Sequence, residues 1–108
     1  MTLKRPPKLA GKVSNLTISF GSQPVISDVN VELYKNQIHV LTGPSGSGKT
    51  TFLRALNRLN DCFEDCRTQG EIELSINGTM QSIHTLNPQR LPELRRKVGM
   101  VFQHPQLL

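Results

Sequence analysis

The stretch from Gly43 to Thr50 reads GPSGSGKT, and it decides how the rest of the chain is interpreted. It contains glycine, four residues, glycine, lysine and threonine, a pattern typical of loops that bind nucleotide phosphates. The pattern is meaningful only between a strand and a helix. The apolar run Ile38–Leu41 before it predicts a strand, and apolar residues at helical spacing predict a helix over Lys49–Leu59.

Each residue type in this stretch has a chemical role in a phosphate cradle. Phosphate oxygens are held mainly by backbone N–H groups, so Gly43, Gly46 and Gly48 allow the loop to wrap closely around them. The helix that begins at Lys49 directs further N–H groups and its positive dipole end at the phosphates. We expect Lys49 to reach the β- and γ-phosphates and the Thr50 hydroxyl to bind Mg²⁺. A flexible glycine–serine turn, the alternative, would need neither residue.

The loop therefore predicts a nucleoside triphosphate as ligand, with ATP and Mg²⁺ as the expected cofactors. The expected nucleotide-contacting residues of the loop are Gly43, Pro44, Ser45, Gly46, Ser47, Gly48, Lys49, Thr50 and Thr51.

Period-two alternation and turn signals predict the other elements. Strands are expected at Val13–Phe20, Val25–Tyr34, Glu71–Ile76 and Met80–Ile83, a short helix at Pro88–Lys97, and a buried parallel strand at Val98–Phe102. Asn77-Gly78 predicts a tight hairpin between the third and fourth of these strands, because both residues tolerate positive φ. Asn60–Gln69 is polar and is interpreted as a connection. This order predicts an α/β fold with an antiparallel flank.

Composition excludes several function classes. The 108 residues include 13 Lys and Arg against 8 Asp and Glu, a formal charge of +5, but these charges are scattered and few aromatic residues accompany them. Nucleic-acid binding is therefore not expected. Cys62 and Cys66 are interpreted as free thiols, because a structural metal site needs four ligands. No run is long enough to span a bilayer, and the basic, proline-broken start lacks a secretion signal. A cytoplasmic protein is expected.

The sequence offers no catalytic acid or base for hydrolysis. An NTPase of this kind also holds Mg²⁺ through an Asp that ends an apolar strand. No apolar run after the loop ends in Asp or Glu, and Val98–Phe102 runs into Gln103. We therefore expect a phosphate cradle without a complete hydrolytic site, and no catalytic residue within this chain.

Residues 10–104 resemble the ATP-binding subunit of ATP-binding-cassette (ABC) transporters. The resemblance lies in the order Phe20-Gly21, VISDVNVEL, GPSGSGKTTFLRALNRLND, GEIELSINGT and LRRKVGMVFQ. It implies that residues 1–108 are the N-terminal part of an ATP-binding domain. The implied fold is a P-loop NTPase core of the ABC type with an antiparallel β subdomain, ending before the helical signature domain.

The resemblance also implies roles for single residues. Phe20 matches the position where the family stacks an aromatic ring on adenine, although a strand-end core residue is the alternative. Val25 would lie against the ribose. Gln103 matches a glutamine that binds Mg²⁺ and touches the membrane subunit. The implied partners are a second ATP-binding subunit and the transmembrane permease subunits, at the cytoplasmic face of the inner membrane.

Within the family, FLRALNRLND and LRRKVGMVFQ are most similar to the phosphate-importing branch. After Gln103 the sequence departs from that branch, since it continues His-Pro-Gln-Leu-Leu. Asn36 stands where the family usually has glycine, and asparagine tolerates the same left-handed conformation. An importer ATPase for inorganic phosphate is the leading hypothesis. The alternatives are an ABC ATPase for another solute, a non-catalytic nucleotide-binding fragment, and a small-molecule P-loop kinase.

Overall fold

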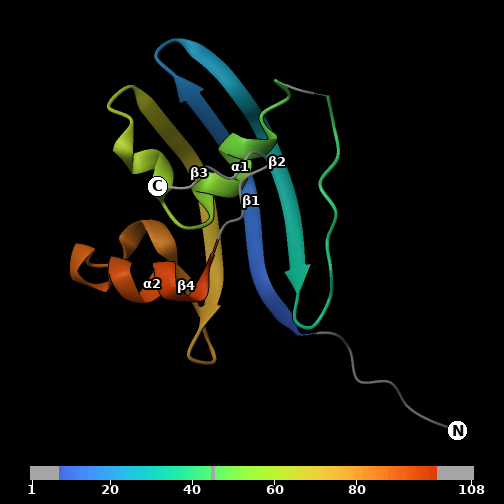
Figure 1. Cartoon of the computed structure of the whole chain (residues 1–108), viewed down its shortest axis with the longest axis vertical. Helices are drawn as coiled ribbons and strands as arrows, with labels where there is room; N and C mark the ends of the chain where they lie inside the picture. The colour runs from blue at the N-terminus through green and yellow to red at the C-terminus, as the bar shows by residue number, and fades with distance from the viewer. Residues whose placement is uncertain (1–7, 45, 100–108) are drawn as a thin grey trace, which may run out of the picture.

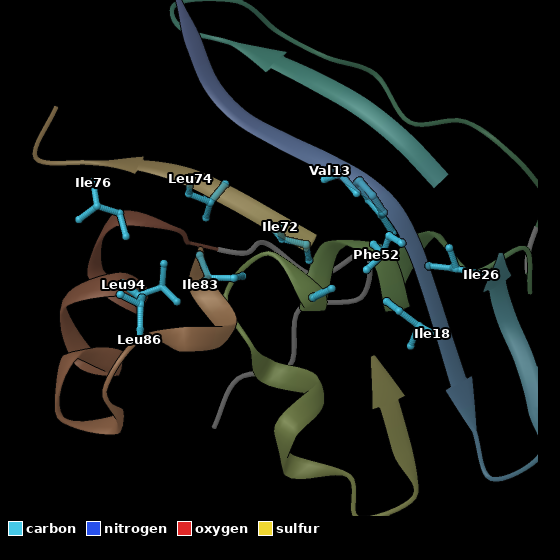
Figure 2. Packing of buried hydrophobic residues seen from close by; sticks show 12 residues of the cluster. Val13, Ile18, Ile26, Phe52, Ile72, Leu74, Ile76, Ile83, Leu86 and Leu94 are labelled. Carbon is cyan, nitrogen blue, oxygen red and sulfur yellow. The ribbon is translucent and has the colours of Figure 1, made fainter. Parts of the chain in front are cut away.

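One four-stranded antiparallel sheet organises the protein, whose structure is a computed structural model that describes residues 8–44 and 46–99. The strands lie in the order β2-β1-β3-β4 (Figure 1). The α-helices and the short 3₁₀ helices pack on one face of this sheet (Figure 2). The elements in chain order are β1 (Leu9–Phe20), β2 (Gln23–Tyr34), α1 (Lys49–Ala55), η1 (Leu59–Cys62), β3 (Cys66–Ile76), β4 (Thr79–Ser82), η2 (Ile83–Thr85), η3 (Pro88–Arg90) and α2 (Leu91–Lys97).

The first two strands form a long antiparallel hairpin. They pair from Phe20 with Gln23 at the turn to Leu9 with Tyr34 at the far end. Both predicted strands are confirmed, and both begin earlier than expected. Asn36, which follows β2, adopts φ 61°, so the asparagine takes the left-handed conformation anticipated for that position.

A bulge in β1 brings its buried residues to one face. Asn15 has φ 50°, and the register shifts between Val13 and Leu16. The Asn15 N–H donates to the Asn30 side-chain oxygen at 2.9 Å in place of a ladder bond. A spacing of three therefore replaces the spacing of two, and Val13, Leu16 and Ile18 all point into the core.

The third strand is longer than its sequence pattern predicts. Only Glu71–Ile76 was expected, because the preceding residues are polar and do not alternate. The backbone from Cys66 onward nevertheless pairs with β1, and Phe20 lies opposite Cys66. The hairpin turn at Asn77-Gly78 is confirmed, with φ angles of 54° and 83°. The return strand ends at Ser82 rather than at Ile83, which begins η2.

The helix after the glycine-rich loop is shorter than predicted. It ends at Ala55 rather than Leu59, because Arg58 adopts a left-handed conformation with φ 61°. The chain then turns into η1. The buried Asn60 side chain stabilises this turn by donating to the Thr51 carbonyl at 3.0 Å. The predicted helix Pro88–Lys97 is confirmed, with its first turn as the 3₁₀ helix η3.

The strand predicted at Ile38–Leu41 is wrong. The segment carries no regular structure, and Ile38 and Val40 are 95% and 79% exposed. A strand needs a hydrogen-bonded neighbour, and none of the four described strands pairs with this segment. The antiparallel flank of the predicted α/β fold is thus observed, but no parallel pairing occurs among the described residues. Of the predicted strand Val98–Phe102, residues 100–102 lie outside the described residues.

The core lies between the sheet and the elements packed on it. Figure 2 shows side chains from β1 and β3 converging with Phe52 of α1 and with Ile83, Leu86 and Leu94 from the C-terminal elements. Buried and more exposed side chains alternate from Ile72 to Ile76 of β3, as burial of a single sheet face requires. This packing holds α1, the helix that follows the glycine-rich loop, against the sheet.

Candidate nucleotide-binding site

The glycine-rich loop ends in an uncapped helix start. Gly48 is the N-cap of α1, has φ 94°, and offers no side-chain cap. The Phe52 N–H donates to the Gly48 carbonyl at 2.9 Å and so begins the helical ladder. The N–H groups of the residues between them have no acceptor within the helix. A helix start of this kind attracts anions, because several donors and the positive dipole end converge there.

Glycine is required at position 48 for two reasons. A φ of 94° is costly for any residue with a Cβ. A Cβ would also lie 3.2 Å from both Val25 Cγ1 and the Val25 carbonyl oxygen, and 3.1 Å from Ile26 Cγ1. Val25 is half-buried in this contact with the loop. The expected ribose-facing residue therefore lies directly beside the expected phosphate-binding residues.

The lysine closes the loop on itself. Lys49 Nζ donates to the carbonyl oxygen of Gly43, at the other end of the motif. A Cβ on Gly43 would lie only 2.8 Å from Ser47 Oγ, so the two arms of the loop approach closely. The residues from Gly43 to Ser47 that are described are exposed. The described part of the loop is thus accessible, and a bond from a cationic side chain joins its two ends.

Thr50 and Thr51 face in different directions. Thr50 is exposed, as a hydroxyl that binds Mg²⁺ must be. Thr51 is only 7% exposed, and its carbonyl accepts from Asn60. Ser45 and Gln103, the remaining expected loop residue and the second expected Mg²⁺ ligand, lie outside the described residues.

A hollow of about 180 Å³ lies beneath the loop. Its walls are the apolar side chains of β2 and α1, among them Val29, Val31 and Phe52, with Lys49 at its edge. An apolar hollow cannot compensate the desolvation of phosphate charges. Phosphates therefore fit only the exposed, N–H-bearing side of the loop.

Phe20, the expected base-stacking residue, ends β1 and is half-buried. Its ring centroid lies 5.8 Å from that of Phe63, and the two rings are nearly perpendicular at 82°. The Arg54 guanidinium lies 5.1 Å from the centre of the Phe63 ring. Sequence reasoning missed Phe63, because it falls in a polar connection without periodicity. Arg54 of α1 also had no expected role.

Both cysteines are free thiols. Cys66 lies opposite Phe20 in the β1–β3 ladder, and burial raises the pKa of its thiol, so it stays protonated near neutral pH. In residues 8–44 and 46–99, no group of three or more His, Cys, Asp or Glu side chains could hold a metal ion. A Mg²⁺ ion would have to be held by Thr50 together with the nucleotide phosphates and residues outside this set. Within the same ranges, no helix has the length and apolarity needed to cross a membrane.

A glycine-rich loop that leads into an uncapped helix start is the arrangement of a P-loop. Residues 26–108 match the model of the ABC transporter family. The chain therefore belongs to that family, whose ATP-binding domains are P-loop ATPases.

Two relatives are phosphate import ATP-binding proteins. The chain is 41% identical over 95 residues to phosphate import ATP-binding protein PstB 2 of Bacillus licheniformis, covering 87% of this chain and 32% of the relative. It is 36% identical over 105 residues to phosphate import ATP-binding protein PstB of Colwellia psychrerythraea, covering 97% of this chain and 36% of the relative. The resemblance to the phosphate-importing branch is confirmed. The chain spans about a third of the length of these relatives.

Proposed function

We propose that this chain forms the nucleotide-binding part of an ABC importer ATPase, and that the transported solute is inorganic phosphate. The observation that carries the proposal is the closed loop at the start of α1, where Lys49 Nζ bonds the Gly43 carbonyl and Gly48 contacts Val25. It combines the positive charge of Lys49 with uncapped N–H groups. The names of the two relatives support phosphate as the solute.

In this proposal, ATP lies along the exposed side of the loop. Lys49 would exchange its bond to Gly43 for bonds to the β- and γ-phosphate oxygens, which are stronger acceptors because they are charged. Phe20 would stack on the adenine and Val25 would contact the ribose. Thr50 and Gln103 would hold Mg²⁺, which neutralises developing charge on the γ-phosphate during hydrolysis.

We propose two kinds of partner and one location. A second ATP-binding subunit would pair with this one, transmembrane permease subunits would carry the solute, and the protein would sit peripherally at the cytoplasmic face of the inner membrane. No nucleic-acid partner is proposed. The ATPase subunit would not contact the solute, so no residue of this chain would recognise it. Deleting the gene should abolish phosphate uptake, and normal phosphate uptake with a defect for another solute would favour the alternative of a different importer.

The second candidate function is nucleotide binding without hydrolysis. It applies to residues 1–108 on their own, in which no apolar run after the loop ends in Asp or Glu. A group that orients the attacking water contributes about 10² to 10⁴ in rate. We therefore expect residues 1–108, produced alone, to release phosphate far more slowly than the full-length gene product with its membrane partner. Equal turnover would place a catalytic carboxylate among Asp61, Glu64, Asp65 and Glu71.

A further inference from the structure

The backbone of Phe20 is held from both sides, which leaves the orientation of its ring to its side-chain neighbours. Phe20 pairs with Gln23 of β2 and with Cys66 of β3. The next N–H, that of Gly21, donates to the Asp65 carbonyl at 2.8 Å. The Cα position is therefore fixed by two ladders. A ring that stacks on a base must also present its face in one direction, so contacts to the ring matter for binding.

Phe63 is the aromatic neighbour that sets this orientation. The two rings meet at 82° with centroids 5.8 Å apart, the favoured edge-to-face arrangement of aromatic pairs. Phe63 remains 43% exposed, which is unusual for a phenylalanine whose role is only to fill the core. Its backbone is anchored at both sides, since its N–H donates to Asn60 and its carbonyl accepts from Cys66.

A cation holds the Phe63 ring in turn. The Arg54 guanidinium lies 5.1 Å from the ring centre, within the range of cation–π attraction. Arg54 comes from α1, the helix that begins with Lys49 and Thr50. Its Nε donates to Asn60 Oδ1 at 3.1 Å, which limits how far the guanidinium can move from the ring.

Asn60 connects this arrangement to the phosphate-binding loop. Its side chain is 3% exposed, and its Nδ2 donates at 3.0 Å to the carbonyl of Thr51. The same amide thus bonds the first turn of α1 and the arginine that covers Phe63. A buried amide with both ends satisfied is costly to rearrange, because a displaced donor or acceptor would be left without a partner.

From these contacts we infer that Phe63, Arg54 and Asn60 are positioning residues for the nucleobase, which fix the Phe20 ring relative to the phosphate-binding loop. The inference rests on the proposed nucleotide-binding function and extends it to residues that do not touch the phosphates. A base and a triphosphate are joined through a single ribose, so the distance between the two subsites must stay within the span of that linkage. The three residues form a path of described contacts between them, from Thr51 through Asn60, Arg54 and Phe63 to Phe20.

The test compares two ligands on the full-length protein, ATP and inorganic tripolyphosphate, each with Mg²⁺, by calorimetric titration. Phe63→Leu keeps an apolar side chain but removes the ring. It should raise the Kd for ATP about two- to tenfold, the range expected for losing one aromatic pair. The Kd for tripolyphosphate should stay within about twofold of wild type, since that ligand has no base. Phe63→Tyr should restore ATP binding, because the exposed ring can carry a hydroxyl.

Tyr34→Leu is the matched control. Tyr34 is a partly exposed aromatic residue at the opposite end of the β1–β2 hairpin, where it pairs with Leu9, so its loss should change neither Kd. The thermal midpoint of each variant shows whether it is folded. Wild-type protein that binds neither ligand would remove the proposed function and this inference with it.

A double-mutant cycle separates positioning from direct contact. If Phe63 acts through Phe20, then Phe63→Leu has no further effect on ATP affinity in a Phe20→Ala background. Independent, additive losses would show that Phe63 touches the base itself and would overturn the inference. So would an unchanged ATP affinity in Phe63→Leu, or an equal loss for ATP and tripolyphosphate, which would indicate general damage to the loop.

Discussion

Replacing Lys49 by alanine is the most direct test of the phosphate site. In the structure, Lys49 Nζ bonds the neutral carbonyl of Gly43, so ATP binding exchanges that acceptor for a charged phosphate oxygen. Hydrogen bonds to charged groups contribute about 1.5 to 3 kcal/mol. Lys49→Ala should therefore raise the Kd for Mg-ATP by about 10- to 150-fold in the full-length protein.

The bond to Gly43 offsets part of this loss. In the proposal that bond exists only in the nucleotide-free protein, so Lys49→Ala also removes the cost of breaking it. The range of about 10- to 150-fold is therefore an upper estimate. Lys35→Ala is a suitable control, because Lys35 is an exposed lysine after β2 and outside the loop. Lys35→Ala changes the net charge by the same amount as Lys49→Ala.

The measurement is a titration with fluorescent or unlabelled ATP at one fixed ionic strength, because charge effects are screened by salt. Lys49→Ala should bind far more weakly than Lys35→Ala, and the two should have similar thermal midpoints. A Lys49→Ala protein that binds ATP within about twofold of wild type would refute the assignment of the loop as a phosphate cradle.

Three further predictions concern the base, the sheet and pH. Phe20→Ala should lower ATP affinity by about 1 kcal/mol or more while Phe20→Tyr retains it; equal binding by both, in the same titration, would reduce Phe20 to a packing residue. Gly70→Ala should lower stability by about 2 kcal/mol or more, because φ is 95° and a Cβ would lie 2.2 Å from the Asn15 carbonyl oxygen; an unchanged thermal midpoint would contradict this geometry. Burial, reinforced by the charge of Arg58, lowers the pKa of His84 below its usual value of 6.5. The folded state therefore favours neutral His84, and its contribution to stability is present above pH 6.5 and lost as the pH falls through the lowered pKa. The urea midpoint of wild type should therefore fall on acidification more than that of His84→Gln, and equal decreases in the two midpoints would contradict this prediction.

Local signals sufficed for a large part of the fold. The hairpin turn at Asn77-Gly78 depends on two residues that tolerate positive φ, and the strands beside it depend on alternation, so both can be read from neighbouring residues. The loop from Gly43 to Thr50 can likewise be identified from neighbouring residues alone. Its glycines, lysine and threonine are required by the chemistry of phosphate binding at a helix start, whatever the rest of the chain does.

Elements that depend on a distant partner could not be predicted in this way. Ile38–Leu41 is apolar enough for a strand but has no described neighbour to pair with, so it stays exposed. Cys66–Gly70 has no alternation yet is a strand, because β1 supplies the hydrogen bonds. The early end of α1 depends on the left-handed Arg58 and on the buried Asn60, neither of which the helical periodicity reveals.

The sequence alone determined the phosphate-binding loop and the family, because both rest on residue types at short, regular spacings. Only the tertiary structure brought Phe63 and Arg54 to Phe20, since these residues come from a connection, a helix and a strand. The contact between Phe20 and Phe63 spans more than forty positions of the chain and follows from how β3 pairs with β1 and how α1 packs on the sheet. Pairings of that range are set by the global packing of the core, which no short window of sequence contains.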